Sequence, residues 1–166
     1  MAFISGVSAF GAGTVYSLAN GDNLFVLGNA NVISSGSRAI HSTDGGCFVT
    51  VAGFVAANDD GIALGNNSTL DSGIRVVVAL GAMVSGGDDG IEIFGPGSFV
   101  NNMGTISGAY GITTNGDGGS HATWLNSGMI SASQDGLHVG GSETRVFTNT
   151  GQVFSRLNAY YSYGIG

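Results

Sequence analysis

Short apolar runs return along this chain at a nearly constant interval. One apolar position recurs after 22, 28, 23, 24 and 23 residues, and its members are Ile33, Val55, Met83, Ile106, Ile130 and Val153. A repeat of about 24 residues made of short apolar runs is typical of a chain that winds into stacked coils. The pattern therefore indicates a repeat architecture.

Two further sets of positions keep the same interval. A dipeptide of glycine and a branched aliphatic residue occurs at Gly61-Ile62, Gly90-Ile91, Gly111-Ile112, Gly136-Leu137 and Gly164-Ile165, with Ala39-Ile40 as an imperfect earlier copy. Another apolar position lies four residues before a glycine or its equivalent, and its members are Leu27, Val49, Val77, Val100, Trp124 and Phe147. Three sets of positions from separate parts of one repeat predict three short strands in each coil.

Local alternation agrees with strands rather than helices. Ile62-Ala63-Leu64, Ile91-Glu92-Ile93 and Leu137-His138-Val139 each place two apolar residues on one face and one residue on the other. Helices are disfavoured because Gly, Asn, Ser and Thr occur throughout the repeat. We therefore predict an all-β, single-domain parallel β-solenoid (β-helix) with about 24 residues and three short strands per coil. Its winding is expected to be right-handed, as parallel crossovers almost always are.

The predicted solenoid occupies residues 24–166 and contains about five to six coils. Residues 1–23 fit the repeat poorly, and we expect them to form an N-terminal cap or a strand that docks onto another subunit. Asn102, Asn126 and Asn149 recur at one corner of the C-terminal coils. Stacked amides can donate to one neighbour and accept from the other, so these residues are expected to form a ladder.

Composition narrows the classes of partner. The 166 residues include four arginines, no lysine and eleven acidic residues, which gives a net charge of −7. No nucleic-acid ligand is expected, because neutralising phosphates requires clustered basic residues. No membrane span is expected either, since the longest apolar stretch, residues 74–84, contains Arg75 and is too short to cross a bilayer as a helix. The single cysteine, Cys47, allows no internal disulfide bond.

Two segments carry a more specific signature. Asn102–Ser107 leads to Gly111-Ile112, and Asn126–Ser131 leads to Asp135-Gly136-Leu137. The shared form, Asn-x-Gly-x-Ile-Ser followed by a Gly-Ile or Gly-Leu dipeptide, resembles the β-solenoid repeats of bacterial secreted adhesins, autotransporter passengers and haemagglutinin-like surface proteins. The resemblance covers about residues 24–166 and is strongest over 88–153. It implies surface exposure and adhesive or structural work, and it transfers no catalytic residue.

Four aspartates form the most suggestive polar cluster. Asp59-Asp60 and Asp88-Asp89 stand at equivalent places on neighbouring coils, just before the Gly-Ile dipeptide. Carboxylates gathered at this density favour a hard cation, so these four residues are candidate ligands of Ca²⁺. The alternative is a solvated turn, in which Asp is favoured for local hydrogen bonding. No other cofactor is expected, and Arg38 is expected to pair with Asp60.

A polysaccharide-acting β-helix is the enzyme alternative. Its site would need paired carboxylates at a defined separation, or a base together with a cation-bound acid. The four aspartates could supply carboxylates, but the chain has no lysine and its arginines are scattered over different coils. We therefore expect no enzymatic activity.

The two ends of the predicted solenoid suggest a function. An open end is a set of unpaired strand edges, which natural solenoids usually cover with a cap. The sequence shows apolar and aromatic residues there instead, and the candidate assembly interface comprises Phe3, Ile4, Val7, Phe10, Tyr160, Tyr161, Tyr163 and Ile165. A head-to-tail contact with little rotation does not close, so it produces a filament.

The expected function is that of an extracellular or cell-surface structural protein that assembles with itself, head to tail, into a filament or surface layer. The alternative is a monomeric adhesin or carbohydrate-binding module whose partner is a cell-surface polysaccharide. Assembly without any ligand distinguishes the first function from the second.

Overall fold

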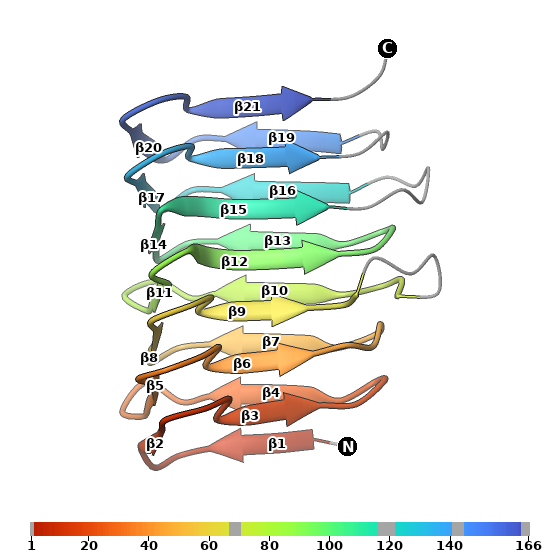
Figure 1. Ribbon diagram of the computed structural model, residues 1–166, viewed down its shortest axis with the longest axis vertical. Coiled ribbons are helices and arrows are strands. Elements are labelled where there is room, and N and C mark those ends of the chain that lie inside the picture. Colours follow the sequence, from red (N-terminus) through yellow and green to blue (C-terminus); the bar gives the residue numbers. More distant parts are fainter. Residues whose placement is uncertain (1, 67–70, 116–121, 141–144, 164–166) are drawn as a thin grey trace.

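The structure, a computed structural model, describes residues 2–66, 71–115, 122–140 and 145–163, which contain strands, turns and bends but no helix. Three parallel sheets form the sides of a β-solenoid, and every coil contributes one strand to each sheet (Figure 1). The predicted all-β solenoid, with about 24 residues and three strands in each coil, is confirmed.

Each sheet contains seven strands within the described residues. Sheet A is formed by β1 (Ala2–Ser5), β4 (Asn23–Val26), β7 (Phe48–Val51), β10 (Arg75–Val78), β13 (Phe99–Asn102), β16 (Ala122–Asn126) and β19 (Arg145–Asn149). Sheet B is formed by β2 (Ala9–Gly11), β5 (Asn31–Ser34), β8 (Phe54–Ala57), β11 (Met83–Ser85), β14 (Thr105–Gly108), β17 (Met129–Ala132) and β20 (Gln152–Ser155). Sheet C is formed by β3 (Tyr16–Leu18), β6 (Ile40–Ser42), β9 (Ile62–Leu64), β12 (Asp89–Phe94), β15 (Tyr110–Asn115), β18 (Leu137–Gly140) and β21 (Tyr160–Tyr163).

Taken in chain order, one strand from each sheet makes one coil, so β1–β3 form coil 1 and β19–β21 form coil 7. The described strands β4–β21 form coils 2 to 7. Coil 1 belongs to residues 1–23, since β1, β2 and β3 pair in parallel with β4, β5 and β6. In Figure 1 the chain runs from left to right along the nearer sheet C and returns along the more distant sheet A as it rises, so the winding is right-handed.

Alternating side chains from the three sheets fill the interior as stacked columns. The inner members of the columns are at most 1% exposed, and they are Leu24, Val49, Val76, Val100 and Trp124 in sheet A, Val32, Val55, Val84, Ile106 and Ile130 in sheet B, and Ile40, Ile62, Ile91, Ile112 and Leu137 in sheet C. Each buried aliphatic side chain contributes about 1.5–3 kcal/mol. The columns therefore hold the coils together.

The sequence prediction of these columns is wrong at two coils. In sheet B, Val32 and Val84 pair with Val55 and face inward, whereas Ile33 and Met83 face outward. In sheet A the inward residues are Leu24 and Val76, in place of the predicted Leu27 and Val77.

Longer corners cause both errors. The corners at 27–30 and 79–82 contain two residues more than the corner at Ala52-Gly53. The amide of Ala82 donates to the carbonyl of Ala79, and Gly81 adopts a φ of 80° within this turn. Counting from Gly81 therefore misplaces the strands on both sides.

The repeat copy predicted at Gly164-Ile165 is also misplaced. Tyr160 pairs with Leu137, so the next place in the column of sheet C comes after a step of 23 residues instead of 28. The sequence pattern misses this position because it is occupied by a tyrosine, whereas the inner members of the column are aliphatic. Gly164 and Ile165 lie outside the described residues.

Candidate functional site

Among the described residues, coils 1 and 7 are the first and last layers of the three sheets. Within the described residues, β1, β2 and β3 are paired on one side only, and so are β19, β20 and β21 (Figure 1). An unpaired edge presents backbone N–H and C=O groups that can template another strand. Both ends of the described solenoid therefore offer a triangular set of parallel strand edges.

The inward columns are less well covered in coil 7. Tyr160, the inward residue of β21, is 50% exposed, although Leu137 below it is fully buried. Phe147 and Val153, the inward residues of β19 and β20, are only partly buried. This uncovered layer is apolar and aromatic, so covering it would contribute favourable free energy.

Four of the predicted interface residues belong to coil 1. Phe3 and Ile4 lie on β1, where Phe3 pairs with Leu24 and so takes a place in the inward column. Val7 at the following corner is 77% exposed, and Phe10 on β2 is 68% exposed. Because alternation places Phe10 outward, it lies on the side of the solenoid rather than on its end.

The other four predicted residues are C-terminal. Tyr160, Tyr161 and Tyr163 lie on β21, and Ile165 lies outside the described residues. The outward ring of Tyr161 stacks on His138, with ring centroids 5.2 Å apart and 19° between the ring planes. Tyr160, in contrast to Tyr161, belongs to the inward column and is half exposed in coil 7.

An asparagine ladder runs along one corner of coils 5, 6 and 7, as predicted. Nδ2 of Asn102 donates to Oδ1 of Asn126 at 2.7 Å, and Nδ2 of Asn126 donates to Oδ1 of Asn149 at 2.7 Å. The two donors also reach backbone carbonyls of the following coil, at Met129 (3.0 Å) and Gln152 (3.3 Å). Because Asn102 and Asn126 are buried, these bonds satisfy groups that would otherwise destabilise the fold.

The four candidate calcium ligands meet at one corner of sheet C. Carboxylate oxygens of Asp59, Asp60 and Asp88 all lie within 4.8 Å of one another. Asp60 and Asp89 form a second such group with Glu92. Asp60 and Asp89 are buried, whereas Asp88 is exposed. The structure therefore places three of the four aspartates in one group, and it places Asp89 in a second group that shares Asp60.

Arg38 adds a positive charge to this corner. Its Nε lies 2.7 Å from Oδ2 of Asp60 and 3.9 Å from Oδ2 of Asp59, and its Nη2 lies 3.8 Å from Oε2 of Glu92. The predicted pair of Arg38 and Asp60 is confirmed. Glu92 is absent from the predicted cluster, although its place directly after the Gly90-Ile91 dipeptide could have indicated it.

Burial dominates the chemistry of the corner. It is the main cause that raises the pKa of Asp89 to about 7, although Thr113 donates a hydrogen bond to this carboxylate. Burial also raises the pKa of Glu92 to about 8, and repulsion from Asp60 adds to the effect. Near neutral pH the corner therefore retains protons that exposed carboxyl groups would have lost.

The assignment of Asp59, Asp60, Asp88 and Asp89 as calcium ligands stays a prediction. Arg38 lies against Asp60 and reduces the negative charge that this group could offer a cation. Calorimetric titration of chelator-treated protein with Ca²⁺ tests the prediction. The absence of heat at millimolar Ca²⁺ would contradict it.

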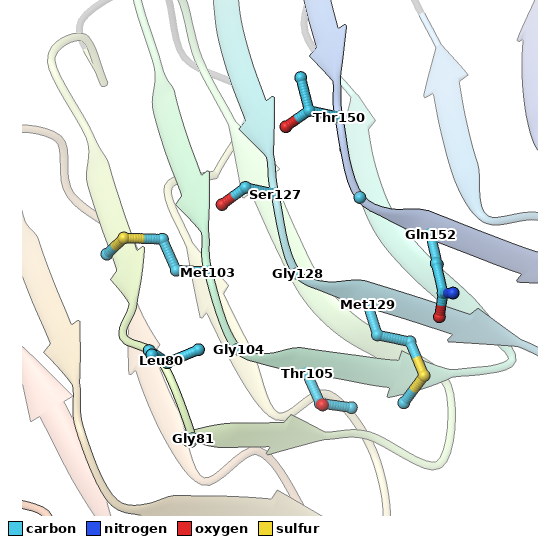
Figure 2. A pocket seen from close by; sticks show the side chains of 11 residues that line it. Leu80, Gly81, Met103, Gly104, Thr105, Ser127, Gly128, Met129, Thr150 and Gln152 are labelled. Carbon is cyan, nitrogen blue, oxygen red and sulfur yellow. The ribbon is translucent and has the colours of Figure 1, made fainter.

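A groove runs along the corner between sheets A and B (Figure 2). Its volume is about 710 Å³, and the side chains that line it are Leu80, Met103, Thr105, Ser127, Met129, Thr150 and Gln152. Stacked glycines line it as well, and a Cβ atom on Gly128 would overlap the carbonyl oxygen of Gly104. In coils 5–7 the groove thus follows from close backbone stacking at corners of two residues.

Comparison with known proteins assigns no family, since no family model, no curated protein and no solved structure matches the chain. Among the described residues there is no helix of the length and apolarity needed to cross a membrane. The resemblance to secreted adhesins and surface proteins therefore rests on the repeat pattern alone. The structure supports the β-solenoid fold that this resemblance implies.

Proposed function

We propose that this protein is an extracellular structural protein that assembles with itself head to tail, so that coil 7 of one subunit stacks on coil 1 of the next. The observation that carries the proposal is the chemical match between the two end layers. Continuing each column by one coil pairs Phe147 with Phe3, Val153 with Ala9 and Tyr160 with Tyr16.

The end residues are alike across the proposed junction. An aromatic residue meets an aromatic residue in sheets A and C, and a small aliphatic residue meets another in sheet B. In sheet C the five inner members of the column are aliphatic, while Tyr16 and Tyr160 stand at its two ends. Tyrosine suits an interface because its ring is apolar and its hydroxyl can bond to water or protein.

The backbone supports the same contact. Stacking would extend all three parallel hydrogen-bonded ladders across the junction, as neighbouring coils do within the subunit. The inward positions of β2 and β3 and of β20 and β21 hold no charged residue, so the contact brings no like charges together in sheets B and C. Because such stacking does not close into a ring, it yields a filament.

Electron microscopy and light scattering over a concentration series test the proposal. The wild type is expected to form filaments without any ligand, and Tyr160→Asp is expected to abolish them because it places a charge in the end layer. Leu80→Asp is the matched control, since Leu80 is 86% exposed on the side of coil 4. A wild type that stays monomeric at every concentration, or filaments that tolerate Tyr160→Asp, would overturn the proposal.

A monomeric module that binds a cell-surface polysaccharide is the second candidate function. The groove favours it, because hydroxyl and amide side chains such as Thr105, Thr150 and Gln152 line an elongated surface. Polysaccharide binding by dilute monomers, weakened at least tenfold (about 1.4 kcal/mol) by Gln152→Ala, would support this function over assembly.

A further inference from the structure

The asparagine ladder ends at Asn149 in coil 7, where one side-chain donor is not used within the described residues. Oδ1 of Asn149 accepts hydrogen bonds from Nδ2 of Asn126 and from the amide of Gly151. Within the described part of the chain, Nδ2 of Asn149 has no acceptor, whereas Nδ2 of Asn126 has two. By the pattern of the ladder, the missing acceptors are a side-chain oxygen and a backbone carbonyl of a following coil.

The strand register identifies the side-chain acceptor. The column that contains Asn149 and Asn102 continues through Val78, Val51 and Val26 and reaches Ser5 on β1. If coil 1 of a second copy stacks on coil 7, Ser5 takes the place above Asn149. A serine hydroxyl is an acceptor for an amide N–H, and a valine is not.

The backbone acceptor follows from sheet B. Nδ2 of Asn126 bonds to the carbonyl of Gln152, the first residue of the sheet B strand on the next coil. Ala9 stands in line with Val153, so Ser8 stands in line with Gln152. The carbonyl of Ser8 in the second copy is therefore placed where the ladder needs it.

We infer that Asn149 continues the ladder into the next subunit, donating through Nδ2 to the Ser8 carbonyl of a second copy of this chain, in the register that places Ser5 of that copy next to Asn149 in the column. The inference rests on the proposed head-to-tail assembly and adds the register in which the subunits join. Stacking on a coil that offers valine would bury the amide of Asn149 without its side-chain acceptor. The ladder thus selects coil 1 as the partner of coil 7.

Disulfide trapping tests the register. One variant carries Ser5→Cys and another carries Asn149→Cys, both in a Cys47→Ala background. Neighbouring strands lie about 4.8 Å apart, within the Cα separation that a disulfide bond tolerates. Oxidation of the mixed variants is expected to give heterodimers on a denaturing gel. Thr148→Cys replaces Asn149→Cys in the off-register control, because Thr148 faces the side of the solenoid, and it should give few heterodimers.

A second test measures the concentration at which filaments form and needs no cross-link. Asn149→Val removes the donor and is expected to raise the concentration at which filaments form by about tenfold. Thr150→Val, at the next and exposed position, should leave this concentration unchanged. Filaments that form normally with Asn149→Val, or that cross-link through the off-register pair, would overturn the inferred register while the proposed assembly holds. The absence of both filaments and cross-links would overturn the assembly itself.

Discussion

Coils 6 and 7 share one fold but differ in what covers them. Trp124 in coil 6 lies between Val100 and Phe147 and is buried, whereas Phe147 in coil 7 is paired within the described residues on one side only. In a solenoid each layer is buried against the next, so the stability of a coil depends on its neighbours as much as on its own residues. An end coil should therefore become as stable as an inner coil when a second subunit covers it.

Truncation of the sheet A column should give the largest effect. Trp124→Ala removes a fully buried side chain and should lower the free energy of unfolding by about 3–5 kcal/mol. Phe147→Ala, one coil further, should cost only about 1–2 kcal/mol in the isolated subunit, because part of its surface is already exposed. Urea denaturation of dilute protein measures both values. Equal costs under these conditions would show that coil 7 is already covered.

Substitutions in the asparagine ladder should lower stability less, and again more in coil 6 than in coil 7. Asn126→Ala leaves a buried donor of Asn102 unpaired and should lower the free energy of unfolding by about 1–3 kcal/mol. Asn149→Ala removes the acceptor of Asn126 in the same way, but Asn149 is exposed and water can replace it, so this variant should cost less than about 1 kcal/mol in the dilute subunit.

A combined variant serves as the control for the ladder. Replacing Asn102, Asn126 and Asn149 together by valine repeats the column of coils 2–4 and leaves no side-chain amide unpaired, although the backbone amides of Gly104 and Gly151 lose their side-chain acceptors. It should recover most of the stability that Asn126→Ala loses. If it is as unstable as Asn126→Ala in urea, packing at the corner rather than hydrogen bonding explains the loss.

The fold could be predicted because inward and outward residues alternate in every repeat. At corners of two residues, such as those with Gly104 and Gly128, counting from the glycine finds the inward position of the next strand. It fails at Gly81, which belongs to a longer turn whose extra residues a glycine pattern does not register. It fails again at Tyr160, because a tyrosine does not resemble the aliphatic members of its column.

The acidic corner could be predicted only in part. Equivalent positions on neighbouring coils stack, which is why Asp60 and Asp89 are found together. Glu92 joins them from an outward strand position, through the length of its side chain and its contact with Arg38. Burial of these acidic groups depends on how neighbouring coils cover the corner. The pattern of residue types in the sequence does not predict this burial.

Asp89 and Asp135 stand at equivalent places on coils 4 and 6, but their pKa values shift in opposite directions. Asp89 lies among other carboxylates, and burial raises its pKa to about 7. Burial alone would also raise the pKa of Asp135, but hydrogen bonds with His138 and with Asn158 of coil 7 outweigh it and lower the pKa. The first corner therefore favours a bound proton, and the second favours the ionised group.

The smallest expected effect is that of pH on the free energy of unfolding, and the opposite pKa shifts determine its sign. Because the pKa values of Asp89 and Glu92 are raised in the folded state, their contribution to stability is complete below about pH 4 and is lost as the pH rises through about 7–8. The contribution of Asp135 has the opposite sign and is lost only as the pH falls below the usual range of an aspartate. Between about pH 6.5 and 7.5 we expect a loss of about 1 kcal/mol, since Arg38 and solvent reduce the limit of about 1.4 kcal/mol per unit for each group.

Urea denaturation of dilute protein at these two pH values measures the loss. Asp89→Asn combined with Glu92→Gln should remove it, because neither replacement titrates. The titration of other groups, such as His41 in the same outward column of sheet C, is common to both proteins and cancels in the difference. Asp44→Asn, at an exposed position, is the control and should keep the wild-type slope. If the double variant loses stability as steeply as the wild type, the buried carboxyl groups of the inner coils are already ionised at neutral pH, and the contrast with Asp135 does not hold.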